Sequence, residues 1–120
     1  MAAKPETSAP TISTHVLDTE RGRPAVGIHV TLSRIGDDGK PIRMTQALTD
    51  GDGRVRDLLE RPLAPGDYRL EFRLGDKGPD AADDAFFRRL AVDLRVEDVT
   101  RSYHVPLLLS SFGMTTYRGS

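Results

Sequence analysis

The sequence predicts an all-β domain, an antiparallel β-sandwich. Apolar and polar residues alternate along residues 28–33, 68–74 and 90–96, which is typical of strands with one face toward a core. Turn-forming Gly, Pro and Asp residues separate these runs at short intervals. The length of 120 residues is that of a single domain.

Eight strands follow from these two signals in order along the chain. We expect them over residues 11–18, 27–35, 41–49, 54–59, 67–74, 88–97, 101–109 and 113–118. The turns between them are expected where Gly stands beside Asp, Arg or Pro, at residues 21–24, 36–39, 50–53 and 65–67. Residues 1–10 contain only small, polar and charged residues after Met1, and we expect a flexible leader before a domain over residues 11–120.

One segment interrupts the strand pattern. Residues 75–87 are polar, and Pro79 is followed by a run of Ala and Asp. Carboxylates early in an Ala-rich stretch favour a short helix, because they interact well with its N-terminal dipole. We therefore expect one short helix between the strands 67–74 and 88–97.

Composition excludes several classes of function. The net charge is −1 with both signs interspersed, which gives no field for binding nucleic acid or an anionic membrane. The absence of Cys excludes disulfides, thiolate catalysis and Cys-ligated metals. No apolar run approaches the roughly 18 residues of a spanning helix. We expect a cytoplasmic protein without nucleic-acid or membrane partners.

Two histidines are candidates for chemistry. Strand alternation turns His15 and His104 away from their apolar neighbours, onto the outer surface of the sandwich. Leu17 and Leu108 share these outer faces, which indicates a contact surface rather than a solvated one. Each histidine alone could be an ordinary surface residue. His29 also points outward but among polar neighbours, and we interpret it as a surface residue.

Arg54 follows the turn at residues 50–53. Turns with this pattern of Asp and Gly occur in many β-sandwiches for reasons of backbone geometry alone, so Arg54 could simply be a turn residue. A guanidinium at this place could instead hold a flat anion through two parallel hydrogen bonds. The turn resembles a calcium loop, but Leu59 stands where the acidic ligand is required. The three histidines also lack the spacing of zinc ligands, and we expect no metal and no cofactor.

The last four residues bring together a phenol, a guanidinium and a hydroxyl. Tyr117, Arg118 and Ser120 follow a strand-like run directly, whereas chain ends are usually tolerant of any residue. They could be an outer-face tyrosine and a frayed end. With the histidines and Arg54, however, they complete an ordered set that resembles the 5-hydroxyisourate hydrolases, the enzyme branch of the transthyretin-like family. The resemblance extends from about Thr11 to Ser120.

The resemblance implies a transthyretin (prealbumin)-like sandwich of two four-stranded sheets with one short helix. It also implies a homotetramer, a dimer of dimers, whose open channel between dimers is lined by outer sheet faces and holds the sites. Such an enzyme opens the ring of 5-hydroxyisourate, a cyclic amide hydrolysis in urate and purine degradation, to 2-oxo-4-hydroxy-4-carboxy-5-ureidoimidazoline.

The roles that follow are hypotheses. His15, Arg54 and His104 are the expected catalytic residues, one histidine taking a proton from water while Arg54 holds the substrate anion. His15, Arg54, Tyr117, Arg118 and Ser120 are the expected substrate-binding residues. The sequence does not distinguish which histidine is the general base.

Two alternatives have no catalysis. A transthyretin-like carrier would bind a small ligand in the channel without turnover, but carriers of that type lack the combination of His, Arg and tail. A structural prealbumin-like module is the other alternative, and such modules usually occur in multidomain or secreted chains.

Overall fold

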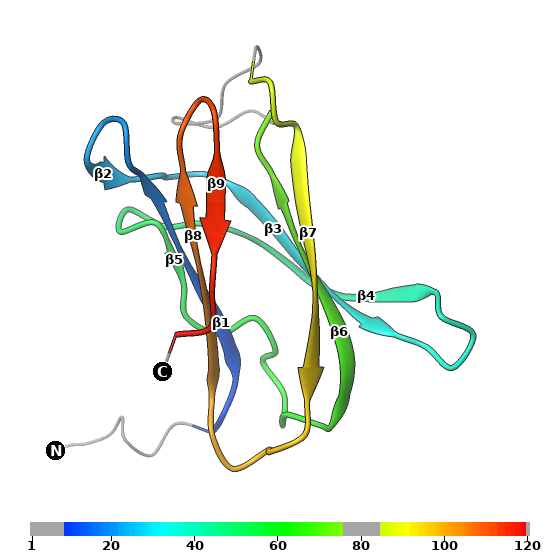
Figure 1. Cartoon of the computed structure of the whole chain (residues 1–120). Helices are drawn as coiled ribbons and strands as arrows, with labels where there is room; N and C mark the ends of the chain where they lie inside the picture. The colour runs from blue at the N-terminus through cyan, green and yellow to red at the C-terminus, as the bar shows by residue number, and fades with distance from the viewer. Residues whose placement is uncertain (1–8, 76–84, 120) are drawn as a thin grey trace, which may run out of the picture.

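Nine strands form two facing sheets in a computed structural model that describes residues 9–75 and 85–119 (Figure 1). The strands are β1 (Ile12–Asp18), β2 (Arg23–Pro24), β3 (His29–Ile35), β4 (Pro41–Leu48), β5 (Arg54–Val55), β6 (Gly66–Arg73), β7 (Arg89–Val96), β8 (Tyr103–Leu109) and β9 (Met114–Thr116). One sheet has the order β2-β1-β8-β9, and β5 also pairs with β1, at residues before those that pair with β2. The second sheet has the order β4-β3-β6-β7. The predicted all-β sandwich is confirmed.

Three details differ from the sequence-based expectation. The two-residue strand β2 makes the first sheet five-stranded rather than four-stranded. The strand predicted over residues 54–59 ends at Val55, because the Asp57 carboxylate accepts hydrogen bonds from the backbone N–H groups of Leu59 and Glu60 and turns the chain. The pair β1 and β8 is parallel, whereas every other pair is antiparallel among the strands that the structure describes.

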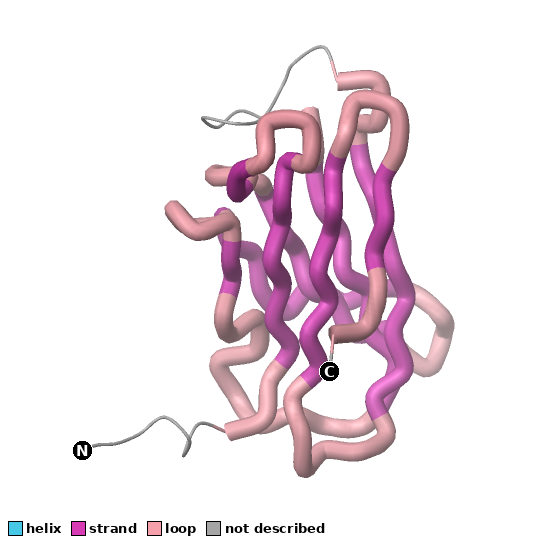
Figure 2. The backbone as a smooth tube through the Cα atoms, turned by 60° about the vertical axis from the view of Figure 1, so that its left-hand side comes forward, coloured by secondary structure: helices cyan, strands magenta, loops and turns pink. Residues whose placement is uncertain are grey.

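The parallel pair is possible because β1 and β8 are far apart in the sequence. Parallel neighbours cannot be joined by a tight hairpin and need a long connection, which here includes the whole second sheet. Figure 2 shows the strands of the first sheet side by side along their length. This pairing brings β1, which carries His15, beside β8, which carries His104.

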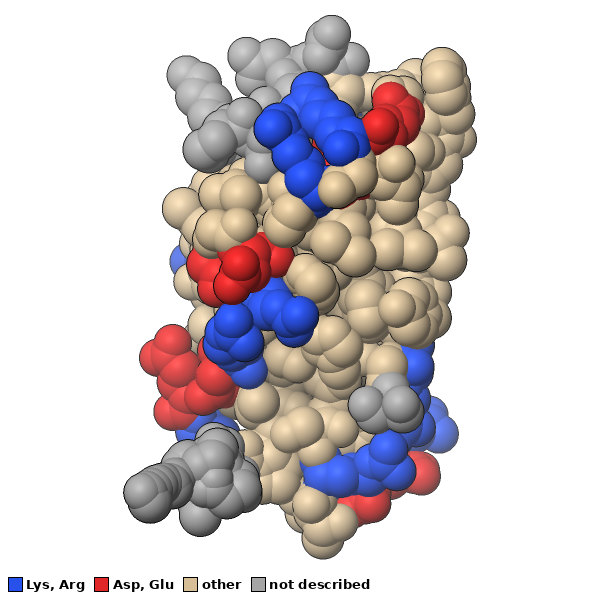
Figure 3. Space-filling view, turned by 90° about the vertical axis from the view of Figure 1, so that its left-hand side faces the viewer, with Lys and Arg blue, Asp and Glu red and all other residues tan. Residues whose placement is uncertain are grey.

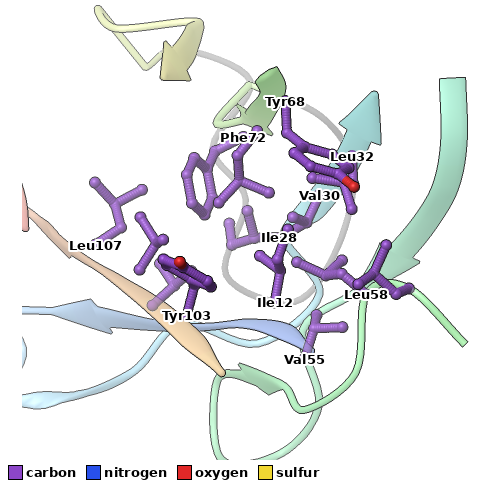
Figure 4. Packing of buried hydrophobic residues seen from close by; sticks show 14 of the residues in the cluster. Ile12, Ile28, Val30, Leu32, Val55, Leu58, Tyr68, Phe72, Tyr103 and Leu107 are labelled. Carbon is purple, nitrogen blue, oxygen red and sulfur yellow. The ribbon is translucent and has the colours of Figure 1, made fainter. Parts of the chain in front are cut away.

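The core lies between the two sheets and is built from the inward faces of their strands (Figure 4). Ile12, Val16 and Leu107 contribute from the first sheet and are fully buried against residues such as Leu70 and Phe72 of the second. Burial of side chains of this size contributes about 1.5–3 kcal/mol each. The core therefore fixes which residues of β1 and β8 are left to face outward.

Some of the elements and site residues predicted from the sequence lie outside the described residues. This applies to residues 1–8 of the expected leader, to residues 76–84 of the expected short helix, and to Ser120. The described segments contain no helix that is long and apolar enough to cross a membrane. The predicted cytoplasmic location stays a prediction.

Gly53 sets how closely β5 approaches β1. Its φ of 77° lies in the left-handed region, and a Cβ added there would stand 2.4 Å from the carbonyl oxygen of Val16. The Gly53 carbonyl accepts a hydrogen bond of 2.7 Å from the Val16 N–H. No residue with a side chain fits this contact without moving β5 away from β1.

We expect Gly53→Ala to destabilise the fold more than Gly22→Ala. Gly22 has a similar φ of 68° but nothing within 4 Å of an added Cβ, so it isolates the conformational cost of about 1 kcal/mol. Gly53→Ala adds a steric cost of about 1–3 kcal/mol. Urea unfolding midpoints of the two variants and the wild type measure the difference. Equal losses would contradict the role of close packing at Gly53.

Candidate active site

The outer face of β1 and β8 carries both predicted histidines. Ile12 and Val16 are fully buried, while Ser13 and His15 between them are half-buried, as the alternation of the strand requires. His104 is half-buried on β8 and is the direct strand partner of Ser13. The predicted outward direction of His15 and His104 agrees with this burial pattern.

Arg54 lies beside His15 because β5 pairs with β1. The two residues are strand partners in an antiparallel ladder, so their side chains project to the same face. The preceding turn is held by Asp50, whose carboxylate accepts hydrogen bonds from the backbone N–H groups of Arg54 at 3.0 Å and Asp52 at 2.8 Å. The bond from Arg54, followed by that from Asp52, lowers the pKa of Asp50 below its usual value.

His15 contacts the same turn through its ring. Its Nε2 lies 2.9 Å from the backbone carbonyl oxygen of Asp52. A carbonyl oxygen can only accept a hydrogen bond, so Nε2 must carry the hydrogen. When the His15 ring is neutral, its lone pair is therefore on Nδ1.

His104 is held on two sides. Its Nδ1 lies 2.8 Å from the Ser13 hydroxyl, and its backbone carbonyl accepts a 2.7 Å hydrogen bond from the N–H of Gly119 in the tail. Burial lowers the pKa of His104 below its ordinary value of 6.5, and the charges of Arg54 and His15 lower that pKa further. These effects all favour the neutral form of the His104 ring.

A hollow of about 300 Å³ brings His104 and Arg54 together. Its other lining residues are Ser13, Thr14 and Arg56, while His15 stands next to Arg54 and does not line the hollow itself. Figure 3 shows the side of the molecule that carries this sheet, a largely uncharged surface with Lys and Arg side chains gathered in separate groups. The hollow is open to solvent in a single protomer.

Ser13 and Arg56 were not among the predicted site residues. Each lies two positions from a predicted one, Ser13 before His15 and Arg56 after Arg54. In an extended chain, residues two apart share a face, so this spacing was the available signal. Arg56 also pairs with the Asp52 carboxylate at 3.5 Å, an exposed contact of small energetic weight.

The tail reaches the site through its glycine. Tyr117 is 52% exposed, and the Arg118 guanidinium lies over the Tyr103 ring at 4.8 Å from its centroid. Neither residue lines the hollow, and their substrate contacts stay predictions. Gly119 forms an isolated bridge with His104, so the tail packs directly on a predicted catalytic residue.

A second hollow of about 370 Å³ lies near the turn between β8 and β9. Exposed Phe86 and Phe112 are part of its wall, and it contains no histidine. It contains the carboxylates of Asp18 and Glu20. His104 and Arg54, two members of the set predicted from the sequence, are at the smaller hollow, which we take as the site.

Comparison with known proteins places the whole domain. Residues 12–119 match the model of the HIUase/Transthyretin family. The 5-hydroxyisourate hydrolase of Deinococcus radiodurans is 44% identical over 117 residues, which cover 92% of this chain and 97% of that protein.

Solved structures of two kinds resemble the fold. The structure of Klebsiella pneumoniae 5-hydroxyisourate hydrolase has a TM-score of 0.78 at 33% identity, covering 92% of this chain and 99% of the other. Sea bream transthyretin in complex with thyroxine has a TM-score of 0.80 at 26% identity, with coverages of 90% and 93%.

We expect His104 to titrate below 6.5 by NMR and its pKa to rise in Arg54→Gln. The rise should be partial, because burial is the largest cause of the lowered pKa and remains in the variant. Arg43→Gln on exposed β4 of the other sheet is the matched control and should leave the titration unchanged.

The same shift makes stability depend on pH. An unfolded chain binds a proton at His104 near pH 6.5, whereas the folded chain does so only at lower pH. The free energy of unfolding should therefore fall as the pH drops through about 6.5. The fall caused by His104 should level off below the pKa that His104 has in the folded chain. A His104 pKa at or above 6.5 would contradict the described environment.

Proposed function

Because the chain belongs to the HIUase/Transthyretin family, we propose that it is a hydrolase that opens the ring of 5-hydroxyisourate in urate degradation. The observation that carries this proposal is the placement of His104 and Arg54 in one hollow, with His15 as the strand partner of Arg54. The relatives named 5-hydroxyisourate hydrolase, at 40–44% identity over nine-tenths of the chain, supply the substrate.

The reaction needs an activated water and a stabilised oxyanion. The water oxygen bonds to the ring carbonyl carbon, the C–N bond breaks, and the nitrogen takes up a proton as the carboxylate forms. Arg54 holds the urate-like anion and shares the negative charge that develops on the carbonyl oxygen. Its position beside the half-buried His104 places that charge in a partly desolvated hollow.

His15 is the better general base of the two histidines. Its Nε2–H is bonded to the Asp52 carbonyl, so the ring accepts a proton at Nδ1 and keeps this bond as an imidazolium. Burial and the charge of Arg54 oppose protonation of His104. His104 therefore serves the reaction as a neutral ring that orients the substrate or water.

The carrier alternative rests on a lower sequence identity, although the two folds are about equally similar to this one. The transthyretin with bound thyroxine is 26% identical, whereas this chain places His104 and Arg54 in one hollow with His15 beside Arg54. No observation favours ligand transport over hydrolysis.

We also propose that four copies assemble as two dimers and that the site is completed in the channel between them. The hollow of one protomer is open, and Tyr117 in the tail is 52% exposed. Leu17 and Leu108 are strand partners on the same outer face and would be covered by a facing dimer. In this assembly, Tyr117 and the chain end at Ser120 would close the pocket by hydrogen bonds.

Alanine variants of the three histidines test the proposed function. We expect His15→Ala and His104→Ala each to lower the rate of 5-hydroxyisourate decay by about 10²–10⁴, the scale of a lost acid–base group. His29→Ala, on β3 of the other sheet, is the control and should keep the wild-type rate. The readout is the ultraviolet decay rate minus the spontaneous rate.

Two results would count against this assignment. A wild-type protein that does not accelerate the decay would remove the proposed hydrolase. Equal losses at all three histidines would indicate a general effect on assembly instead of chemistry.

Light scattering tests the proposed assembly. The expected mass is about four times the 13.2 kDa of one chain. A monodisperse monomer at micromolar concentration that is still fully active would show that one protomer holds a complete site and would overturn the shared channel.

A further inference from the structure

Ser13 contacts His104 although it belongs to a different strand. The Ser13 hydroxyl lies 2.8 Å from His104 Nδ1, within hydrogen-bond distance, and both side chains are partly buried. The two residues are strand partners in the parallel pair of β1 and β8. The register of the sheet therefore fixes the hydroxyl beside one particular edge of the His104 ring.

Gly119 occupies the opposite edge of the same ring. A Cβ added to Gly119 would stand 2.9 Å from His104 Cδ2, so the tail backbone is in close contact with that edge. A half-turn of the ring would exchange Nδ1 with Cδ2 and lose the bond to Ser13. The bond to Ser13 therefore favours one of the two orientations of the ring. In that orientation Nδ1 bonds to Ser13, and Nε2 is the other ring nitrogen.

The neutral His104 ring carries a single hydrogen, on either Nδ1 or Nε2. Burial of the ring disfavours a second hydrogen, and the positive charge of Arg54 in the same hollow disfavours it further. A hydroxyl can donate to a bare Nδ1 or accept from Nδ1–H, and the choice decides what Nε2 offers the substrate. Only the first arrangement presents an N–H donor at Nε2.

We propose that Ser13 is a positioning residue, whose hydroxyl donates to Nδ1 of His104 and holds this ring as the Nε2–H tautomer. The inference rests on the proposed function for its catalytic consequence. An N–H donor suits a site that must bind carbonyl oxygens of the substrate and stabilise the oxyanion that forms from one of them.

The two histidines then have opposite roles, one as a proton acceptor and one as a hydrogen-bond donor. A backbone carbonyl sets the first role and a serine hydroxyl sets the second. The Asp52 carbonyl fixes hydrogen on Nε2 of His15 and leaves its Nδ1 as an acceptor. The Ser13 hydroxyl fixes hydrogen on Nε2 of His104 and leaves that nitrogen as a donor. One ring can therefore accept a proton from water while the other donates a hydrogen bond.

The test compares Ser13→Ala with Ser13→Thr. Ser13→Ala removes the hydroxyl, Ser13→Thr keeps it, and Thr31→Ala on β3 is a control in the other sheet. Nitrogen-15 chemical shifts of labelled histidine report directly which ring nitrogen carries the hydrogen. They require no substrate, so they separate a failure of this inference from a failure of the proposed hydrolase.

In the wild type and in Ser13→Thr we expect His104 to be the Nε2–H tautomer. In Ser13→Ala we expect a mixture of tautomers and a fall in kcat of about 5- to 10-fold, the rate equivalent of one hydrogen bond. Ser13→Thr should recover most of the kcat, and Thr31→Ala should match the wild type in both readouts.

Three results would overturn the inference. His104 could carry its hydrogen on Nδ1 in the wild type, in which case Ser13 accepts rather than donates. Ser13→Ala could keep the single Nε2–H tautomer, so that the hydroxyl does not select it. A loss of kcat without a change of tautomer would show that Ser13 acts by contacting the substrate instead.

Discussion

The parallel pairing of β1 with β8 is the constraint on which the site depends. It aligns Ser13 with His104 and places His15 one step further along the same face. The buried Thr14 hydroxyl donates a 2.6 Å hydrogen bond to the Val105 carbonyl and adds a second tie between the two strands. A slip of one residue would turn every inward side chain of β1 outward, and burial of Ile12 and Val16 opposes it. Core packing thereby determines the positions of groups that are not themselves in the core.

The contact of Gly53 with Val16 attaches Arg54 to this framework. The short strand β5 makes few ladder contacts of its own, and the turn before it is stabilised by the Asp50 carboxylate. The same turn presents the Asp52 carbonyl to His15. One tight turn therefore positions a cation and selects the tautomer of a histidine, which explains why its glycine and aspartates serve both the fold and the site.

The candidate site lies on an open outer face for a geometrical reason. A small sandwich encloses only its apolar core, so polar groups that act on a substrate must lie on an outer face. Here they are half-buried around an open hollow, and the tail crosses over His104 at Gly119. Assembly of further copies over this face would exclude water and strengthen the interaction of Arg54 with an anion.

Most strands, their inward and outward faces, and the candidates His15, Arg54 and His104 could be predicted from the sequence. Alternation and turn residues are local properties, and they can be read without knowing which strands become neighbours. The end of β5 at Val55 and the added strand β2 escaped prediction because each depends on hydrogen bonds to partners elsewhere in the turn or sheet.

The contacts between polar groups could not be predicted in this way, because they depend on long-range packing. The parallel register joined Ser13 to His104 across 91 positions of sequence, and the tail placed Gly119 against the same ring. The lowered pKa of His104 likewise required burial and the approach of Arg54. The sequence specifies which side chains are present. The protonation and orientation of a histidine, however, depend on neighbours that long-range packing brings to within a few ångströms.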